Sequence, residues 1–116
     1  MAAGLPDALP LAKRAAIVTR AAIPHLTRPG GRIVNVSSTF GLAGYPATTA
    51  YAVAKGGIAQ LTRQLGAELA PEGILVNAVA PGVIEPPMTG QHLHNPYYNR
   101  AIVEPTPLRR VGQPEG

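Results

Sequence analysis

Apolar residues spaced three and four apart predict a first helix over about residues 10–27. The positions that carry this pattern are Leu11, Ala15, Val18, Ala22 and Leu26. Such spacing gathers side chains on one face of a helix. Pro24 removes one backbone donor near the end of the helix, and Pro29 with the two glycines that follow it ends the helix.

The same spacing predicts a second, longer helix over about residues 48–70. Its apolar positions are Ile58, Leu61, Leu65 and Leu69. These residues again share one helical face. The run Pro71-Glu72-Gly73 closes the helix, because proline and glycine both interrupt helical backbone.

Two short runs rich in β-branched residues predict strands over residues 32–37 and 74–79. Neither run alternates strictly between apolar and polar residues, which favours strands covered on both faces, as in a parallel sheet. The order helix, strand, helix, strand predicts a right-handed βαβ unit with a leading helix, hence an α/β fold. From Pro81 to the end, frequent prolines predict an irregular tail over residues 81–116.

Composition narrows the class of protein. The chain has 116 residues, of which 46% are hydrophobic and 14% charged, as in a soluble globular protein with one domain or part of one. The net charge of +4 is spread along the chain and aromatic residues make up 4%, so no nucleic-acid surface is expected. No apolar run reaches the roughly twenty residues of a membrane span, and no secretory signal begins the chain, so we expect a cytoplasmic protein.

The sequence gives no reason to expect a metal site. The chain has no cysteine, which excludes disulfides and cysteine ligands. His92 and His94 lie two residues apart but lack a third ligand nearby, and a solvent-exposed loop accounts for them.

Three polar residues offer a coherent chemistry. Ser38 follows the first predicted strand, and Tyr51 and Lys55 lie four residues apart on one face of the second helix. Ligands bind at the carboxyl ends of strands in open α/β sheets, which is where these residues fall. The Lys55 ammonium is placed to favour the phenolate form of Tyr51, and the Ser38 hydroxyl can bind the same substrate oxygen as the phenol.

On spacing alone, this site is ambiguous. A tyrosine and a lysine four residues apart on a helix are commonly surface residues, and a serine after a strand is commonly a cap or turn residue. The three residues indicate a particular function only when they are considered together with the sequence blocks that surround them.

Those blocks are residues 31–38 (GRIVNVSS), 51–57 (YAVAKGG) and 74–82 (ILVNAVAPG). In order and distance they resemble the short-chain dehydrogenase/reductase family, in its classical branch. The resemblance implies a Rossmann-type doubly wound parallel sheet, of which this chain carries the C-terminal half. It also implies hydride transfer between NAD or NADP and a small-molecule alcohol or carbonyl.

The resemblance assigns roles residue by residue. Tyr51 is expected to be the catalytic acid or base, Lys55 to assist it and to hold the nicotinamide ribose together with Tyr51, and Ser38 to orient the substrate oxygen. Cofactor contacts are also expected from the loop after the second strand, Pro81, Gly82, Val83 and Ile84. In the family, the two long helices pack against a partner subunit, so a homo-oligomer is expected.

The chain also departs from the family pattern. It contains no Thr-Gly-x-x-x-Gly-x-Gly turn, the loop that lets backbone approach a dinucleotide pyrophosphate. The region that selects NAD or NADP is not in the sequence, and the substrate cannot be inferred. Two hypotheses follow: a fragment of an oxidoreductase that lacks the phosphate loop, or a non-catalytic remnant that acts through association with a partner subunit.

Overall fold

The computed structural model describes residues 5–84 and 94–115, with side chains from residue 12 onward, so His92 lies outside the described residues. The chain divides into two compact units, Met1–Ala80 and Pro81–Gly116. The first contains, in order, α1 (Leu5–Ala22), β1 (Arg32–Val36), α2 (Thr49–Leu69) and β2 (Leu75–Val79). Short 3₁₀ turns at Ile23–His25, Thr39–Gly41 and Ala70–Glu72 connect these elements.

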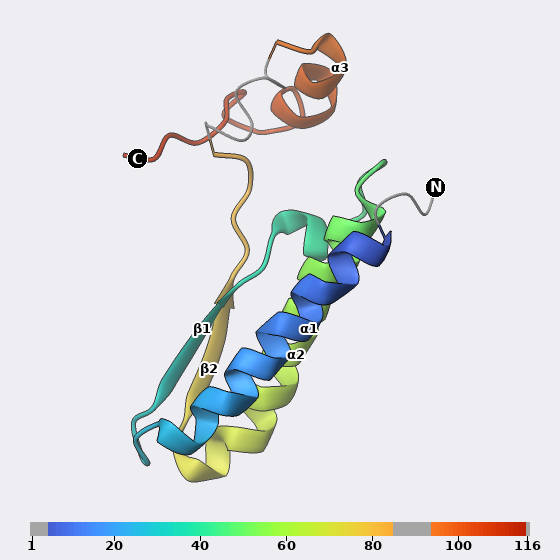
Figure 1. Cartoon of the computed structure of the whole chain (residues 1–116). Coiled ribbons are helices and arrows are strands. Elements are labelled where there is room, and N and C mark those ends of the chain that lie inside the picture. The colour runs from blue at the N-terminus through green and yellow to red at the C-terminus, as the bar shows by residue number, and fades with distance from the viewer. Residues whose placement is uncertain (1–4, 85–93, 116) are drawn as a thin grey trace. The chain divides into compact units, whose positions relative to one another are not determined.

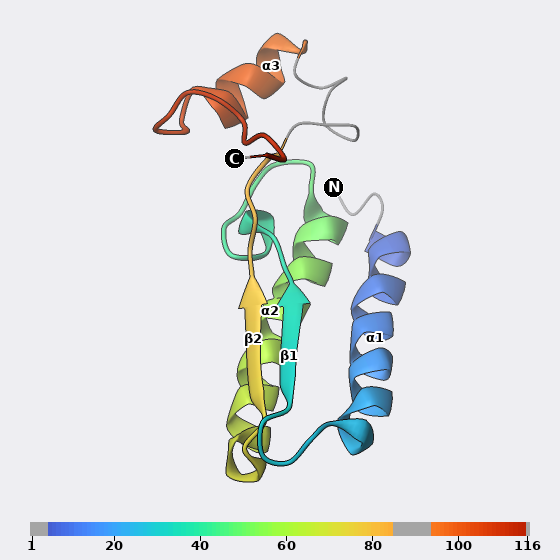
Figure 2. The same cartoon turned by 90° about the vertical axis from the view of Figure 1, so that its left-hand side faces the viewer.

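The two strands form a parallel sheet with α2 as the crossover between them (Figure 1). Their register runs from Arg32 beside Leu75 to Val36 beside Val79. The Ser37 amide donates to the Val79 carbonyl at 2.8 Å, which carries the pairing one residue past β1. Helix α2 contacts both strands and α1, so it is the element that joins the layers (Figure 2). This is the predicted parallel α/β arrangement.

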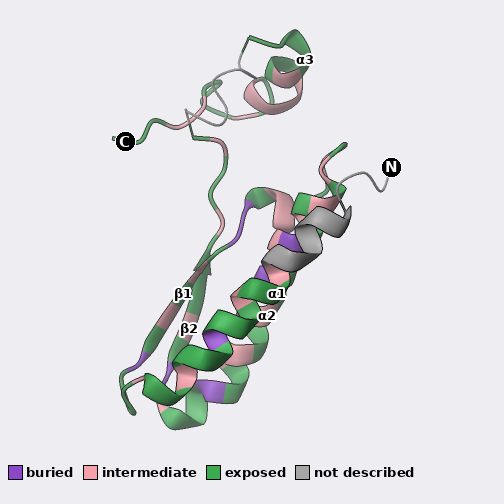
Figure 3. Ribbon diagram, in the orientation of Figure 1, coloured by how far each residue is buried: buried purple, intermediate pink, exposed green. Residues whose placement is uncertain are grey.

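One face of α2 supplies most of the buried core. Its buried positions are Ala54, Ile58, Ala59, Thr62 and Leu69. Ile58 and Leu69 belong to the predicted apolar stripe, whereas the other three are small residues that the stripe did not include. Small side chains let backbones approach closely, and Figure 3 shows the buried positions along this helix. Ile74, which precedes β2, is fully buried at 0% exposure.

Helix α1 differs from the sequence prediction in its bounds and in its buried face. It begins at Leu5, and a 3₁₀ turn replaces the α-helix after Ala22. Val18, part of the predicted stripe, is exposed, and Thr19 beside it is buried. The Thr19 hydroxyl donates to the Ala15 carbonyl at 2.8 Å, so its burial leaves no hydroxyl unpaired. Because α1 packs mainly on α2, the buried face is selected by helix-to-helix fit and not by hydrophobicity alone.

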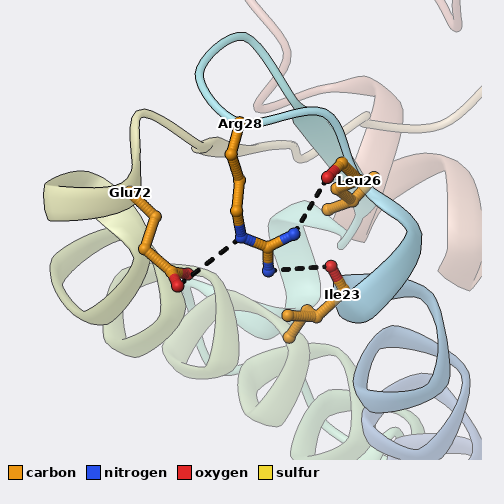
Figure 4. A network of polar contacts seen from close by, with 4 residues as sticks. All are labelled: Ile23, Leu26, Arg28 and Glu72. Atoms are coloured by element: carbon orange, nitrogen blue, oxygen red, sulfur yellow. Dashed lines mark hydrogen bonds and ion pairs between the residues drawn. The ribbon is translucent and has the colours of Figure 1, made fainter.

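Arg28 links the ends of the two helices (Figure 4). Its guanidinium donates to the carbonyls of Leu26 at 2.9 Å and Ile23 at 3.0 Å, and Nε lies 3.5 Å from the Glu72 carboxylate. The two carbonyls lie at the end of the first helical segment, and the Ile23 carbonyl also accepts from the Leu26 amide at 3.2 Å. Beside this network, the Gly30 amide donates to the Gly73 carbonyl at 2.9 Å, so the two turns that enter the strands are held together.

The second unit is more regular than the predicted irregular tail. Helix α3 (Pro96–Tyr98) continues as a π-helical turn at Asn99–Val103. The Asn95 side chain accepts from the Tyr97 amide at 2.9 Å and caps the first turn. Ile84 and Gly112 form a parallel bridge. Within the described residues of the chain, no helix combines the length and apolar character needed to cross a membrane.

The side-chain amide of Asn35 (Nδ2) donates to the Thr62 hydroxyl at 2.9 Å, and that hydroxyl donates to the Ile58 carbonyl at 2.8 Å. This pair ties β1 to α2. We expect Thr62→Val to lower the free energy of unfolding by about 1–2 kcal/mol, because the part-buried amide loses its acceptor while the volume is conserved. Urea denaturation measures the change.

Thr19→Val is the matched control, since the Thr19 hydroxyl bonds only within its own helix. It should change stability by less than about 0.5 kcal/mol. Equal losses in the two variants would contradict the role assigned to the contact between β1 and α2.

The sheet face opposite α2 carries exposed apolar side chains beside the polar Arg32 and Asn77, and no described element of the first unit covers it. Val34 is 64% exposed and Val36 55% exposed on this face, next to Val79 at 50%. We expect self-association at micromolar concentrations, since exposed apolar strands in a sheet with open edges attract further chains.

Combined Val34→Thr and Val36→Thr substitutions should reduce this association, because threonine keeps the β-branched shape and removes apolar surface. Sedimentation velocity measures it. Leu108→Thr, which alters an exposed residue of the other unit, is the control. A variant that associates as strongly as the unaltered chain would rule out this face as the cause.

Candidate active site

Ser38 is held in a turn directly after β1. It is 7% exposed and caps the 3₁₀ turn Thr39–Gly41. Its Oγ accepts from the Phe40 amide at 3.2 Å, and its carbonyl accepts from the Gly41 amide at 2.9 Å. Because the amide uses the hydroxyl oxygen as an acceptor, the hydroxyl hydrogen remains available for donation to another group.

Lys55 lies two turns into α2 and is fixed against the end of β1. Its Nζ donates to the Val36 carbonyl at 3.0 Å, and its own backbone carbonyl accepts from the Ser37 hydroxyl at 2.7 Å. Both bonds join the helix to residues that immediately precede Ser38. The ammonium is therefore positioned by the backbone of β1.

Tyr51 lies one turn before Lys55 and is 44% exposed. The Lys55 Nζ is 5.8 Å from the centre of the Tyr51 ring, within the range of a cation–π contact. The Phe40 ring meets the Tyr51 ring edge-on, with centroids 6.4 Å apart, and stacks on Tyr45 at 4.8 Å. Through Phe40, the turn that carries Ser38 contacts the phenol directly.

The first unit thus brings together the three residues that the sequence singles out. An exposed phenol, an ammonium with N–H donors beyond the one given to Val36, and a serine hydroxyl lie around the carboxyl end of β1. Such a set can exchange a proton with a substrate oxygen, bind that oxygen by a second hydrogen bond, and stabilise negative charge.

Sequence reasoning missed the residues that hold this arrangement. Ser37 and Phe40 contact Lys55 and Tyr51, but neither belongs to a spacing that marks chemistry. The signal for Phe40 is its rarity, since it is the one phenylalanine of the chain and lies two residues after Ser38. No comparable signal identifies Ser37, because its bond to Lys55 spans eighteen residues.

The predicted cofactor loop, residues 81–84, opens the second unit. The Val83 carbonyl accepts from the Gly112 amide at 2.9 Å, and Ile84 forms the bridge to Gly112. Gly82 and Val83 line a cavity of about 300 Å³ within this unit. The rest of its lining is Ile102, Thr106, Leu108, Arg110, Val111 and Gly112.

The sequences that this chain matches include dehydrogenases and reductases. Residues 12–116 match the family described as enoyl-(acyl carrier protein) reductase. The chain is 46% identical over 97 residues to cyclopentanol dehydrogenase from Comamonas sp., covering 83% of this chain and 39% of that protein. It is 42% identical over 100 residues to a 3-oxoacyl-[acyl-carrier-protein] reductase from Rickettsia prowazekii, covering 85% and 41%. The chain therefore spans about two fifths of the length of these relatives.

Solved structures of similar fold also include dehydrogenases. A putative 2-deoxy-D-gluconate 3-dehydrogenase from Agrobacterium tumefaciens, with bound NADP, matches with a TM-score of 0.66 and 40% identity over 72% of this chain and 34% of that one. A 4-hydroxyisoleucine dehydrogenase complexed with NADH matches with a TM-score of 0.70 and 29% identity over 87% and 41%. The matched part of each structure shares the partial Rossmann-type fold of this chain. The chain belongs to the short-chain dehydrogenase/reductase family.

Proposed function

We propose that the protein is an NAD(P)-dependent oxidoreductase that interconverts a small-molecule alcohol and a carbonyl, with Tyr51 as the acid or base. The observation that carries the proposal is the arrangement of Lys55 between the Val36 carbonyl and the Tyr51 ring, next to the turn of Ser38. Because the chain spans about two fifths of the length of its relatives, we take it to be a fragment of such an oxidoreductase that retains the residues of proton transfer.

In the direction of reduction, Tyr51 donates its phenolic proton to the substrate oxygen as the carbonyl becomes an alcohol. Ser38 donates a hydrogen bond to the same oxygen and orients it. The Lys55 ammonium stabilises the negative charge left on the phenol, as an opposite charge at short range does. In the direction of oxidation, each residue acts in reverse, and Tyr51 accepts the proton.

Lys55 and Tyr51 are also the residues in the first unit that suit a nicotinamide ribose. One N–H of the Lys55 ammonium is committed to Val36, and the group carries further donors for hydroxyl oxygens. When bound, the cofactor supplies or accepts the hydride. Residues 81–84 are the proposed second contact, on family resemblance. Relatives with NADP and with NADH are both known, so either cofactor suits the family.

A second candidate function is association without catalysis, in which the chain binds a partner subunit. The uncovered apolar face of the sheet favours it, since Val34, Val36 and Val79 would be buried by a partner chain. The helices α1 and α2 offer a second surface for a homo-oligomer, as in the family. Cofactor binding separates the two functions.

We expect the chain to bind NADH or NADPH in a direct fluorescence titration, with affinity reduced by Lys55→Met, which removes the ribose donors but keeps an unbranched side chain one atom shorter. The absence of any saturable binding at millimolar cofactor would favour the association function for this chain.

Tyr51→Phe should lower the rate of ketone reduction on the order of 10²–10⁴-fold, because it removes the phenol hydroxyl that supplies the transferred proton. Oxidation of NADPH or NADH, followed by absorbance, measures the rate. Tyr45→Phe is the matched control, since it removes a phenol hydroxyl from the neighbouring ring that stacks on Phe40. A Tyr51→Phe variant as active as the control would disprove the role of Tyr51.

A further inference from the structure

We propose that Ser37, Gly41 and Gly56 are positioning residues that dock the turn of Ser38 onto one peptide bond of α2, between Lys55 and Gly56. This inference rests on the proposed function, because the groups that the contact aligns are Ser38, Tyr51 and Lys55. It concerns residues that neither bind the substrate nor carry the transferred proton.

The first observation is the space around Gly41. A Cβ atom at Gly41 would lie 2.6 Å from the Lys55 carbonyl carbon, 2.7 Å from the Gly56 amide nitrogen and 2.8 Å from the Lys55 carbonyl oxygen. These atoms are backbone and cannot rotate away, so any other residue at position 41 must push the turn off the helix. Gly41 is required by this close approach alone, since its φ is not in the left-handed region.

The second observation is that the partner of Gly41 is also a glycine. A Cβ atom at Gly56 would lie 3.2 Å from the Gly41 carbonyl oxygen, a tight contact that a shift of a few tenths of an ångström relieves. The two backbones therefore meet without side chains between them. The next residue, Gly57, has ordinary space, because its Cβ atom would lie 3.8 Å from the Ala12 side chain.

The third observation is that Ser37 binds the same peptide from the other side of Ser38. Its buried hydroxyl donates to the Lys55 carbonyl at 2.7 Å, and its amide donates to β2 at Val79. The Gly41 amide in turn donates to the Ser38 carbonyl at 2.9 Å. Ser38 is therefore fixed at both ends, by Ser37 before it and Gly41 after it, to the residue that carries the ammonium.

Four single substitutions test the proposal in the full chain. Gly41→Ala should lower kcat by about 100-fold with an unchanged KM for the cofactor, because displacement by about 1 Å misaligns the Ser38 hydroxyl with Tyr51. Gly56→Ala should lower kcat by about tenfold, in keeping with its smaller clash. Gly44→Ala, in the same loop with nothing within 4 Å, and Gly57→Ala, on the same helix, should stay within about twofold of the unaltered chain.

Nuclear magnetic resonance gives a readout that does not depend on activity. In Gly41→Ala, exchange of the Phe40 amide hydrogen should accelerate at least about tenfold, since its bond to Ser38 opens with the turn. Cross-peaks between the Phe40 and Tyr51 rings should weaken. The slow exchange of the Phe40 amide and the ring cross-peaks should both be retained in Gly44→Ala and Gly57→Ala. Gly56→Ala gains helix propensity and serves as the variant that stays folded.

The two proposals fail in different ways. If the unaltered chain shows no turnover, the proposed function fails, and the exchange and ring signals still decide the positioning role. If Gly41→Ala keeps the Phe40 exchange rate and ring cross-peaks of Gly44→Ala, the positioning proposal is overturned. A Gly41→Ala variant with an unchanged kcat in an active chain overturns it as well.

Discussion

The packing of one face of α2 is the constraint on which the first unit depends. Helix α2 contacts both strands and α1, and its buried residues are mostly small, with Ala54, Ala59 and Thr62 among them. Small residues allow short distances between backbones, and short distances let the turn after β1 reach the helix. Because the same helix carries Tyr51 and Lys55, the packing of the core and the geometry of the candidate site are set by one element.

Lys55 shows how the core and the site are coupled. Its backbone carbonyl accepts from Ser37 and its ammonium donates to Val36, so the residue is held at both ends by the end of β1. The neighbouring Tyr51 is held less: its ring contacts Phe40 and Lys55 and is 44% exposed. This arrangement suits a site in which the Lys55 ammonium stays in place while the accessible Tyr51 phenol exchanges a proton.

The sequence was sufficient for features that depend on local pattern. The α/β class followed from the spacing of apolar residues, and the helical face shared by Tyr51 and Lys55 followed from their separation by four. Features that depend on contacts distant in sequence were missed. Thr19 is buried in place of Val18 because the fit against α2 decides the face of α1, and the pattern along α1 contains no information about α2. The turn of Ser38 meets α2 through glycines, which carry no hydrophobic signal. Frequent prolines predicted an irregular tail, yet Pro96 opens a short helix, where a missing amide hydrogen costs nothing.

The exposed sheet face affects the stability of the unit that carries the candidate site. Val34, Val36 and Val79 are exposed on the face opposite α2, whereas the contacts around Lys55 involve the end of β1 and the first turns of α2. Covering the sheet would therefore add stability without changing the hydrogen bonds that orient the ammonium. The geometry of the candidate site residues is local to one βαβ unit, while the stability of that unit depends on what packs against its other face. Activity and stability should for this reason respond to different substitutions, the first to residues at the Lys55–Gly56 peptide and the second to residues of the uncovered face.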